Sequence, residues 1–383
     1  MQIQDNTNPY LNFMYALNAP ETKRQYPKRF QVFFNFLGMN GSLEQNCNLL
    51  YEKSISNVTW LQSQIINFFR VQKNRVENEE IALATVRNYY KPIKLFCDMN
   101  NILVNWKLIS KGLPKGNQVA KDRIPTREEI LKLIDFADVR MKPIILTIIT
   151  SGIRIGAWDT MQLKHITPKL KNGEVIAAKL LVYPGSEEQY FTFITSEAYN
   201  SLKVWMDFRE SFGEKITGDS WVMRDLWRIR NQKYGNYLGS AKNPIKLQSG
   251  GIRMIITRAL HVQGIRNELM QGENRHEFKT VHGFRKYFKT VCEQYMRPAN
   301  VEVLMGHSIG ISDSYYRPKE SELLNDYLNA IDALTLNEEN RLKRQVSELE
   351  TKQAEISLMK LDHQREIKNV REEMHEKIDQ LIS

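Results

Sequence analysis

The chain has 383 residues, a formal net charge of +10 and a hydrophobic content of 42%. This length and composition exclude a largely disordered chain and predict two or three globular domains. The positive charge belongs to residues 1–334, because residues 335–383 hold nine Lys and Arg against eleven Asp and Glu. A basic body predicts a polyanionic partner, most simply nucleic acid, although composition alone fits an ordinary basic protein equally well.

Cysteine usage and hydropathy indicate the compartment. Cys47, Cys97 and Cys292 are scattered and give neither a disulfide framework nor the spacing of a zinc site, which fits a reducing interior. The first ten residues lack the basic and apolar segments of a signal peptide, and the longest apolar run, residues 143–149, is too short to span a bilayer. We therefore expect a cytoplasmic, nucleoid-associated protein without a membrane partner.

Residues 1–110 are predicted to form a helical domain. Apolar residues recur with a period close to 3.6 over residues 57–75 and 83–102, and Pro92 alone interrupts the second stripe. Three cations accompany that stripe, namely Arg87, Lys91 and Lys94. They could follow a phosphate backbone, but an ordinary amphipathic helix with a solvated face would carry the same pattern.

A linker is predicted at residues 111–123, which are rich in Gly, Lys and Pro. After it, Thr126 and Glu129 have the spacing of a capping box that begins a helix. The apolar segment that follows is predicted to be a buried helix ending at Gly152. A second domain is therefore expected from residue 124 onward.

The second domain, residues 124–334, is expected to be mainly helical with one small β-hairpin. β-Branched and aromatic residues flank a polar turn and predict strands near residues 175–183 and 190–195. The segments after the hairpin return to helical patterns. The predicted fold class is thus mainly α with a small β-hairpin, an α+β arrangement within the second domain.

Residues 335–383 carry a heptad-like repeat, in which positions alternate by four and three and eight of twelve are apolar. The positions are 342, 346, 349, 353, 356, 360, 363, 367, 370, 374, 377 and 381. We predict a C-terminal coiled-coil helix that is imperfect at Lys360 and His363. A long solvated single helix is the alternative.

Five side chains with complementary chemistry follow one another in the second domain. Arg154 comes just after the predicted helix end. His282 and Arg285 are one helical turn apart, which predicts a common face. His307 follows 22 positions after Arg285, and Tyr316 follows nine positions after His307.

These residue types suit the chemistry of a phosphodiester. Two guanidinium groups fit its non-bridging oxygens, stay charged at any relevant pH and stabilise the extra charge of a five-coordinate transition state. A tyrosine hydroxyl becomes a usable nucleophile in that positive field, and histidines can hydrogen-bond phosphoryl oxygens or relay protons. A lysine near the 5′ oxygen could protonate the leaving group. This reaction requires no metal.

The ordered set resembles the tyrosine recombinase (phage integrase) family over roughly residues 10–330. The matching motifs are T-S-G-I-R ending at Arg154, H-x-x-R at His282 and Arg285, and L-x-G-H-S around His307. The nucleophilic tyrosine of the family usually falls nine residues after that histidine, which selects Tyr316 over Tyr315. The residues around Tyr316 and the hairpin are most similar to integrases of archaeal mobile elements.

Two positions depart from the family pattern. Members usually carry Glu or Asp three residues after the first arginine, where this chain has Ala157, and Asp159 is the nearby acidic residue that could substitute. The family's lysine lies on the hairpin, often near its turn, and this turn has none. Some members place the lysine in the first strand, so the resemblance assigns Lys179 as general acid. Tyr315 is expected to be the core residue of the tyrosine pair.

The resemblance implies a clamp around DNA, with residues 1–110 as the core-binding domain and residues 124–334 as the catalytic domain. It implies that Tyr316 attacks a scissile phosphate, forms a 3′-phosphotyrosyl bond and frees a 5′ hydroxyl, so that strands are rejoined without ATP. Family members act as tetramers on two paired duplexes, and the predicted coiled coil could help to link their subunits.

The resemblance also assigns the supporting roles. Arg154 and Arg285 would bind the phosphate, His307 would support it by hydrogen bonding and His282 would assist proton transfer. A nicking-closing enzyme similar to type IB topoisomerases is an alternative with the same chemistry, and a catalytically silent architectural DNA-binding protein is another. The sequence holds neither a Walker A loop nor a dinucleotide fingerprint, so no cofactor and no small-molecule substrate is expected.

Overall fold

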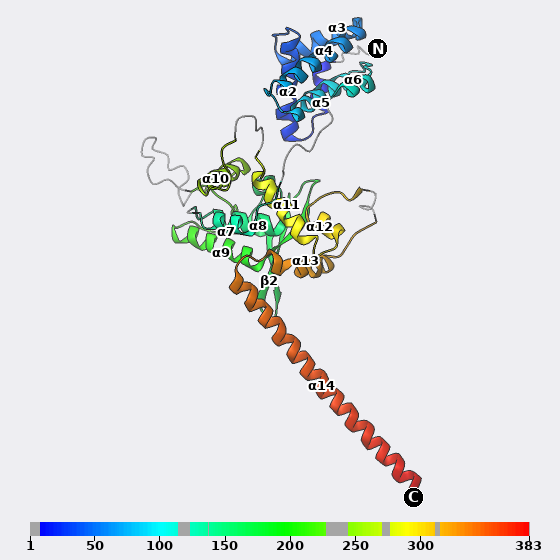
Figure 1. The fold of residues 1–383 in the computed structure, drawn as a ribbon, viewed down its shortest axis with the longest axis vertical. Coiled ribbons are helices and arrows are strands. Elements are labelled where there is room, and N and C mark those ends of the chain that lie inside the picture. The colour runs from blue at the N-terminus through cyan, green and yellow to red at the C-terminus, as the bar shows by residue number, and fades with distance from the viewer. Residues whose placement is uncertain are drawn as a thin grey trace, which may run out of the picture. The chain divides into compact units, whose positions relative to one another are not determined.

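The computed structural model describes residues 8–113, 123–136, 138–226, 244–269, 276–310 and 315–382. This part of the chain is mainly helical and contains one three-stranded antiparallel sheet (Figure 1), which confirms the predicted fold class in outline. The chain divides into two compact units, the first comprising residues 1–120 and 269–275 and the second residues 121–268 and 276–383.

The first unit is a helical body with a phenylalanine-rich core. Its described helices are α1 (Pro9–Tyr15), α2 (Pro20–Phe36), α3 (Leu43–Ser56), α4 (Val58–Glu77), α5 (Leu83–Met99) and α6 (Trp106–Gly112). Phe13, Phe30, Phe33, Phe68 and Phe96 are completely buried, and their rings contact one another at centroid distances of 5.1–6.4 Å. Aromatic burial on this scale is a main source of stability for a small helical body.

Local signals explain where these helices begin. The Ser42 side chain accepts from the Gln45 backbone N–H in a capping box that begins α3, and Asn57 accepts from Trp60 N–H at the start of α4. Pro92 lies buried inside α5 without ending it, so the predicted stripe continues through it. The helix α6 runs to Gly112, and the rest of the expected linker, residues 114–122, lies outside the described residues.

The second unit is built around the buried helix α8. Its described helical elements are α7 (Arg127–Ile134), α8 (Met141–Ser151), η1 (Ile155–Asp159), η2 (Leu163–His165), α9 (Ser196–Ser211), α10 (Ser249–Val262), α11 (Thr280–Cys292), α12 (Pro298–Leu304), α13 (Glu320–Leu334) and α14 (Glu338–Ile382). The capping box of Thr126 and Glu129 begins α7 as predicted, and α8 ends at Gly152 as predicted. Packing of α8 against α7, α9 and α11 buries almost its whole surface.

The sheet has the order β1 (Ile166–Lys171), β2 (Glu174–Val182) and β3 (Tyr190–Thr195), all antiparallel. The two predicted strands are confirmed as β2 and β3, whereas β1 was not anticipated. It is an edge strand with mostly exposed side chains. These side chains and Pro168 within the strand weaken the sequence pattern by which a β-strand is predicted.

A buried ion triad fixes the segment after α9. Glu214 is 4% exposed and receives hydrogen bonds from Arg209 and Arg224, both completely buried. Arg209 also donates to the Trp221 carbonyl at 2.9 Å. The three side chains therefore tie the C-terminal end of α9 to the segment that precedes residue 226.

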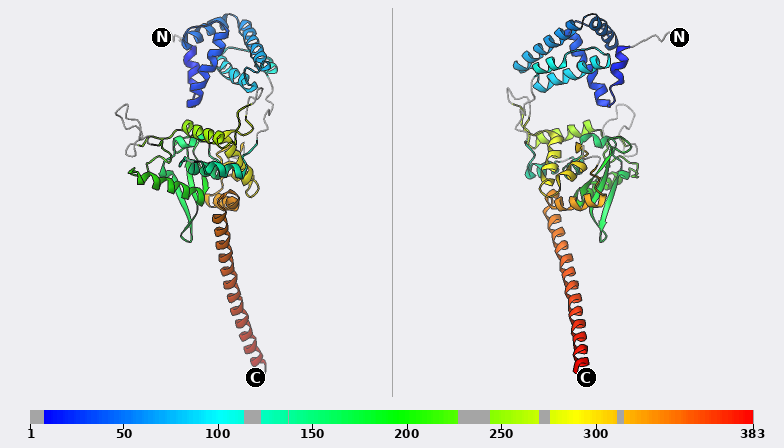
Figure 2. Two further views of the ribbon diagram at one scale, coloured as in Figure 1. Left: turned by 60° about the vertical axis from the view of Figure 1, so that its left-hand side comes forward. Right: turned by 90° about the vertical axis from the view of Figure 1, so that its right-hand side faces the viewer.

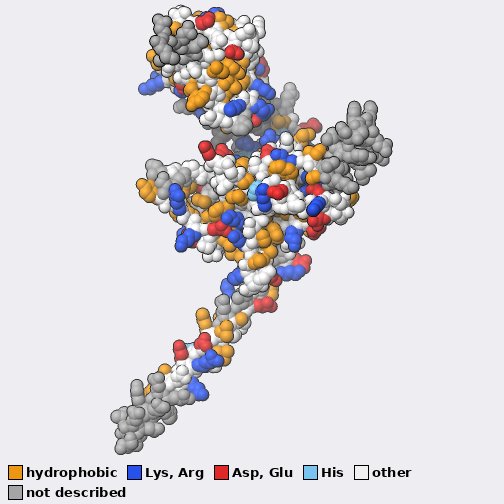
Figure 3. Space-filling model, turned by 180° about the vertical axis from the view of Figure 1, so that it is seen from behind, with side chains coloured by type: hydrophobic (Ala, Val, Ile, Leu, Met, Phe, Trp, Pro, Cys, Tyr) orange, Lys and Arg blue, Asp and Glu red, His pale blue; other side chains and the backbone are white. Residues whose placement is uncertain are grey.

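The last helix, α14, is one unbroken helix in both views of Figure 2. Its apolar side chains are exposed, with Leu342, Val346, Ile356 and Ile367 at 42–52%, and Figure 3 shows hydrophobic side chains at intervals along it. Its first turns are joined to α13 by the ion pair of Arg344 and Asp332 at 2.8 Å. Within the described ranges, no helix combines the length and apolar character needed to cross a bilayer.

Candidate active site

Arg154 is positioned by the sharp end of α8. Gly152 adopts φ 63°, and a Cβ there would lie 2.4 Å from the Phe288 ring, so only glycine fits without moving that ring. The chain then extends through Arg154 before η1. The two terminal nitrogens of the Arg154 guanidinium donate to the Gly306 carbonyl at 3.3 and 3.2 Å.

Arg285 reaches the same place from α11. It is 5% exposed and donates to the Gly152 carbonyl, to the Met305 carbonyl at 2.7 Å and to His307 Nε2 at 2.6 Å. Burial lowers the pKa of Arg285, and the nearby positive charge of Arg154 lowers it further. The structure therefore brings two predicted arginines and one predicted histidine together.

The tautomer of His307 follows from its partners. A guanidinium can only donate, so His307 Nε2 accepts from Arg285 and the ring proton lies on Nδ1, which donates to Glu302. Lys289 binds the other oxygen of Glu302. Burial raises the pKa of the Glu302 carboxyl, but the hydrogen bonds from Lys289 and His307 outweigh it and lower that pKa.

Sequence reasoning missed Glu302 and Lys289. The available signal was a carboxylate five residues before His307, at the distance of little more than one helical turn. Glu302 also accepts from the His307 backbone N–H at 3.0 Å, so the same residue holds both the main chain and the ring of His307.

The hairpin presents two tyrosines to the arginines. Tyr183 and Tyr190 lie at the two ends of the turn with ring centroids 6.3 Å apart, and Tyr183 adopts φ 52°. The Tyr190 ring covers Gly306, where a Cβ would approach it to 2.5 Å. Burial raises the pKa of Tyr190, while the charges of Arg285 and Arg154 act in the opposite direction.

Lys179 occupies a different position. Its ammonium group pairs with Glu320 at 2.6 Å and lies 4.7 Å from the Phe191 ring centroid. Lys169 binds the other oxygen of Glu320 at 2.5 Å. Glu320 is the first residue of α13, so the two lysines attach the sheet to the start of that helix.

The tyrosine pair is arranged differently from the expectation for Tyr315. Tyr315 is 86% exposed, so its prediction as the core residue is wrong. Tyr316 is half-buried and donates to Asn300 Oδ1 at 2.5 Å. Asn300 is 3% exposed and donates in turn to Asp326 at 2.6 Å. The Tyr316 hydroxyl is thus bound near the beginning of α12, whereas Arg285 contacts the residue just after its end.

Two further expectations concern neighbours of the arginines. His282 lies in the first turn of α11 and is exposed, whereas Arg285 one turn later is buried. Ala157 is buried. Asp159 accepts from the Ser249 backbone N–H at 2.7 Å, so its carboxylate fixes the start of α10.

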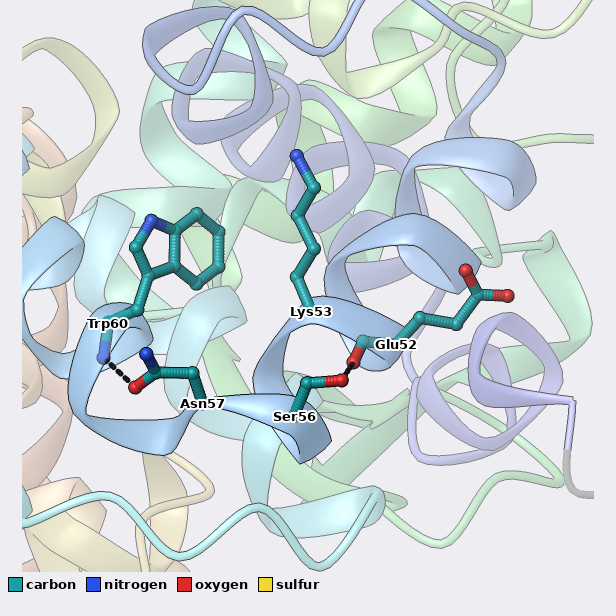
Figure 4. Close-up of a pocket in the computed structure, with 5 residues that line it drawn as sticks. All are labelled: Glu52, Lys53, Ser56, Asn57 and Trp60. Carbon is teal, nitrogen blue, oxygen red and sulfur yellow. Dashed lines mark hydrogen bonds between the residues drawn. The ribbon is translucent and has the colours of Figure 1, made fainter.

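The first unit carries a separate shallow hollow between α3 and α4, lined by Glu52, Lys53, Ser56, Asn57 and Trp60 (Figure 4). Lys53 Nζ lies 5.8 Å from the centroid of the Trp60 ring. Arg87 and Lys91 on α5 are exposed, as the sequence predicted for a solvated or phosphate-facing surface. Figure 3 shows Lys and Arg side chains distributed over both units.

Comparisons with known proteins give structural neighbours only. Neither a family model nor a curated protein matches the sequence. The XerA recombinase is similar at 16% identity and a TM-score of 0.35, over 83% of this chain and 96% of that chain. The XerH site-specific recombinase, bound to a palindromic difH substrate in a post-cleavage complex, is similar at 15% identity and a TM-score of 0.45, over 82% of this chain and 92% of that chain. A lambda integrase dimer bound to a COC′ core site is similar at 13% identity and a TM-score of 0.43, over 76% of this chain and 97% of that chain.

Proposed function

We propose that this protein is a site-specific DNA recombinase of the integrase type, which cleaves and rejoins DNA through a 3′-phosphotyrosyl bond to Tyr316. The observation that carries the proposal is the convergence of Arg154 and Arg285. Among the described residues, neither guanidinium has a carboxylate partner in an ion pair, and both donate to backbone carbonyls instead. Two unneutralised, partly buried cations at one point favour an anion, and a forked guanidinium pair suits a phosphate.

The proposed mechanism needs neither ATP nor a metal. Arg154 and Arg285 bind the non-bridging oxygens and stabilise the charge of the transition state, and His307 supports them by hydrogen bonding. His282 assists proton transfer. Tyr316 must first leave Asn300, after which it attacks phosphorus in its own subunit or in a neighbour's. The ester energy stays in the phosphotyrosyl bond, so a 5′ hydroxyl of another strand can displace the tyrosine.

The larger arrangement is part of the same proposal. Residues 1–110 serve as a core-binding domain, residues 111–123 as linker and residues 124–334 as catalytic domain, together enclosing duplex DNA. Residues 335–383 form a coiled coil that links subunits of a tetramer on paired sites. A nucleoid-associated enzyme of an archaeal mobile element fits this assignment.

Covalent trapping tests the proposal even before the target site has been identified. The protein is incubated with nicked fragments of source genomic DNA, from which the strand released at the nick diffuses away. We expect a covalent adduct that survives denaturation, and sequencing of the trapped DNA maps the cleaved phosphate. Tyr316→Phe should abolish the adduct, while the matched control Tyr315→Phe should retain it.

The alternatives give different results. A topoisomerase-like enzyme would relax supercoiled plasmid without pairing two sites. An architectural protein would shift DNA in a native gel but yield no adduct, and that result would refute the proposed function. Loss of the adduct in Tyr315→Phe but not in Tyr316→Phe would move the nucleophile by one residue.

A further inference from the structure

The hairpin places a hydroxyl group where the proposed reaction needs a proton. The Tyr190 hydroxyl is buried beside the Arg285 guanidinium, and it makes no hydrogen bond of good geometry to any described residue. A buried hydroxyl without a well-formed hydrogen bond is costly, so its presence here calls for a ligand or a function. The ring of Tyr190 lies against Gly306, the residue whose carbonyl binds Arg154.

Lys179, the other candidate acid on the hairpin, makes its contacts elsewhere. Its ammonium group is paired with Glu320, which Lys169 also binds, so its proton is held in an ion pair at the start of α13. The charges that act on Tyr190 are instead those of Arg285 and Arg154. Of the two hairpin groups, Tyr190 is therefore the one beside the proposed phosphate site.

We propose that the Tyr190 hydroxyl is a catalytic residue that donates a proton to the departing 5′ oxygen, an inference that rests on the proposed recombinase function. An unperturbed phenol has a pKa of about 10 and is a much stronger acid than an alcohol. Two adjacent guanidinium groups stabilise the phenolate that remains. Burial raises the pKa of Tyr190, which keeps the hydroxyl protonated before cleavage.

The proposed step balances in both directions. The Tyr316 oxygen forms a bond to phosphorus as the P–O5′ bond breaks, and the electron pair passes to O5′, which takes the Tyr190 proton. The Tyr316 proton passes to water. During rejoining, the Tyr190 phenolate accepts the proton of the attacking 5′ hydroxyl as the bond between phosphorus and Tyr316 breaks, and water reprotonates Tyr316.

A sulfur-for-oxygen substitution in DNA tests this role. The full-length protein is given two nicked duplexes with the mapped cleavage site, one natural and one with sulfur replacing the bridging 5′ oxygen. A thiol has a pKa of about 8.5, so a thiolate leaves without receiving a proton. We expect Tyr190→Phe to form the adduct about 100-fold more slowly on the natural DNA. On the sulfur DNA its rate should return to within about threefold of the unmodified protein, since only the acid is missing.

Two control variants make the result decisive. Tyr199→Phe, a hydroxyl deletion on α9, should leave both rates unchanged. Lys179→Gln should not show selective rescue by sulfur; if it does and Tyr190→Phe does not, the lysine is the acid and the inference is overturned. Equal slowing of Tyr190→Phe on both DNAs, or a clear fall in its Tm, would also overturn it. Absence of any adduct with the unmodified protein would instead refute the proposed function itself.

Discussion

At the scale of single residues, the state of His307 depends on a carboxylate that takes no part in the proposed bond changes. Glu302 holds the Nδ1 proton of His307, and Arg285 holds Nε2. Such a partner fixes ring orientation and tautomer. Glu302 is thus a positioning residue that acts through His307.

Glu302→Ala should slow adduct formation by about tenfold to 100-fold, because His307 loses the partner that fixes its tautomer. The measurement is the single-turnover rate of adduct formation for Glu302→Ala, His307→Ala and the double variant. If Glu302 acts through His307, the double variant should be no slower than His307→Ala. Additive losses would show that Glu302 has a separate role.

Part of the candidate site could be predicted from single residues of the sequence. The order of Arg154, Arg285 and His307 predicted a shared site, and the structure brings these three side chains together from separate segments. The Tyr316 contact with Asn300 could not be predicted, since it joins residues through tertiary packing that leaves no periodic signal. The same holds for the Lys179 pair with Glu320, 141 positions away.

At the scale of elements, the buried ion triad holds the end of α9 to the segment beyond it. Glu214→Gln leaves Arg209 and Arg224 as buried charges without a counterion, which should cost about 3–5 kcal/mol. For a unit of this size, the fall in Tm should be on the order of 10 °C. Asp219→Asn is the matched control, because its pair with Lys164 is exposed to solvent and its loss should leave the Tm nearly unchanged.

The triad also predicts a dependence of stability on pH. Burial raises the pKa of Glu214, but hydrogen bonds from Arg209 and Arg224 outweigh it and lower that pKa below its ordinary value. This contribution is present above the unfolded pKa of about 4.3 and is lost as the pH falls through the folded pKa. Urea unfolding between pH 7 and pH 3 should show this loss in the unmodified protein and a smaller loss in Glu214→Gln. Equal pH profiles would contradict it.

Element prediction succeeded where local chemistry decides the structure. The capping box at Thr126 and the helix end at Gly152 depend on neighbours in sequence, and β2 and β3 carry dense β-branched and aromatic residues. Strand β1 contains Pro168 and exposed side chains, and it exists because β2 pairs with it across the sheet. Pairing between strands can stabilise a segment whose own β-strand propensity is weak.

At the scale of the whole molecule, α14 offers an exposed apolar row that suits a second copy of itself. Leu349 lies on the predicted seam at 65% exposure, and Leu358 lies off it at 63% exposure. We expect Leu349→Glu to lower self-association of the full-length protein in sedimentation velocity and to reduce paired-site assembly on DNA. Leu358→Glu removes a leucine of equal exposure and should change neither.

Two other outcomes would contradict the predicted seam of α14. If both variants associate like the unmodified protein, α14 is a solvated single helix and the subunits meet elsewhere. If Leu358→Glu alone disrupts association, a seam exists with a register different from the one proposed.

If Tyr316 is the nucleophile proposed above, its hydrogen bond with Asn300 holds it back from attack. One such bond is worth about 1 kcal/mol net, which keeps the phenol docked in most molecules at any instant. A recombinase of the proposed kind would meet many phosphates outside its target site, and in most of those brief encounters the phenol would still be bound to Asn300. A phosphate that stays bound through several docking and undocking events would therefore be cut in preference to one that leaves quickly.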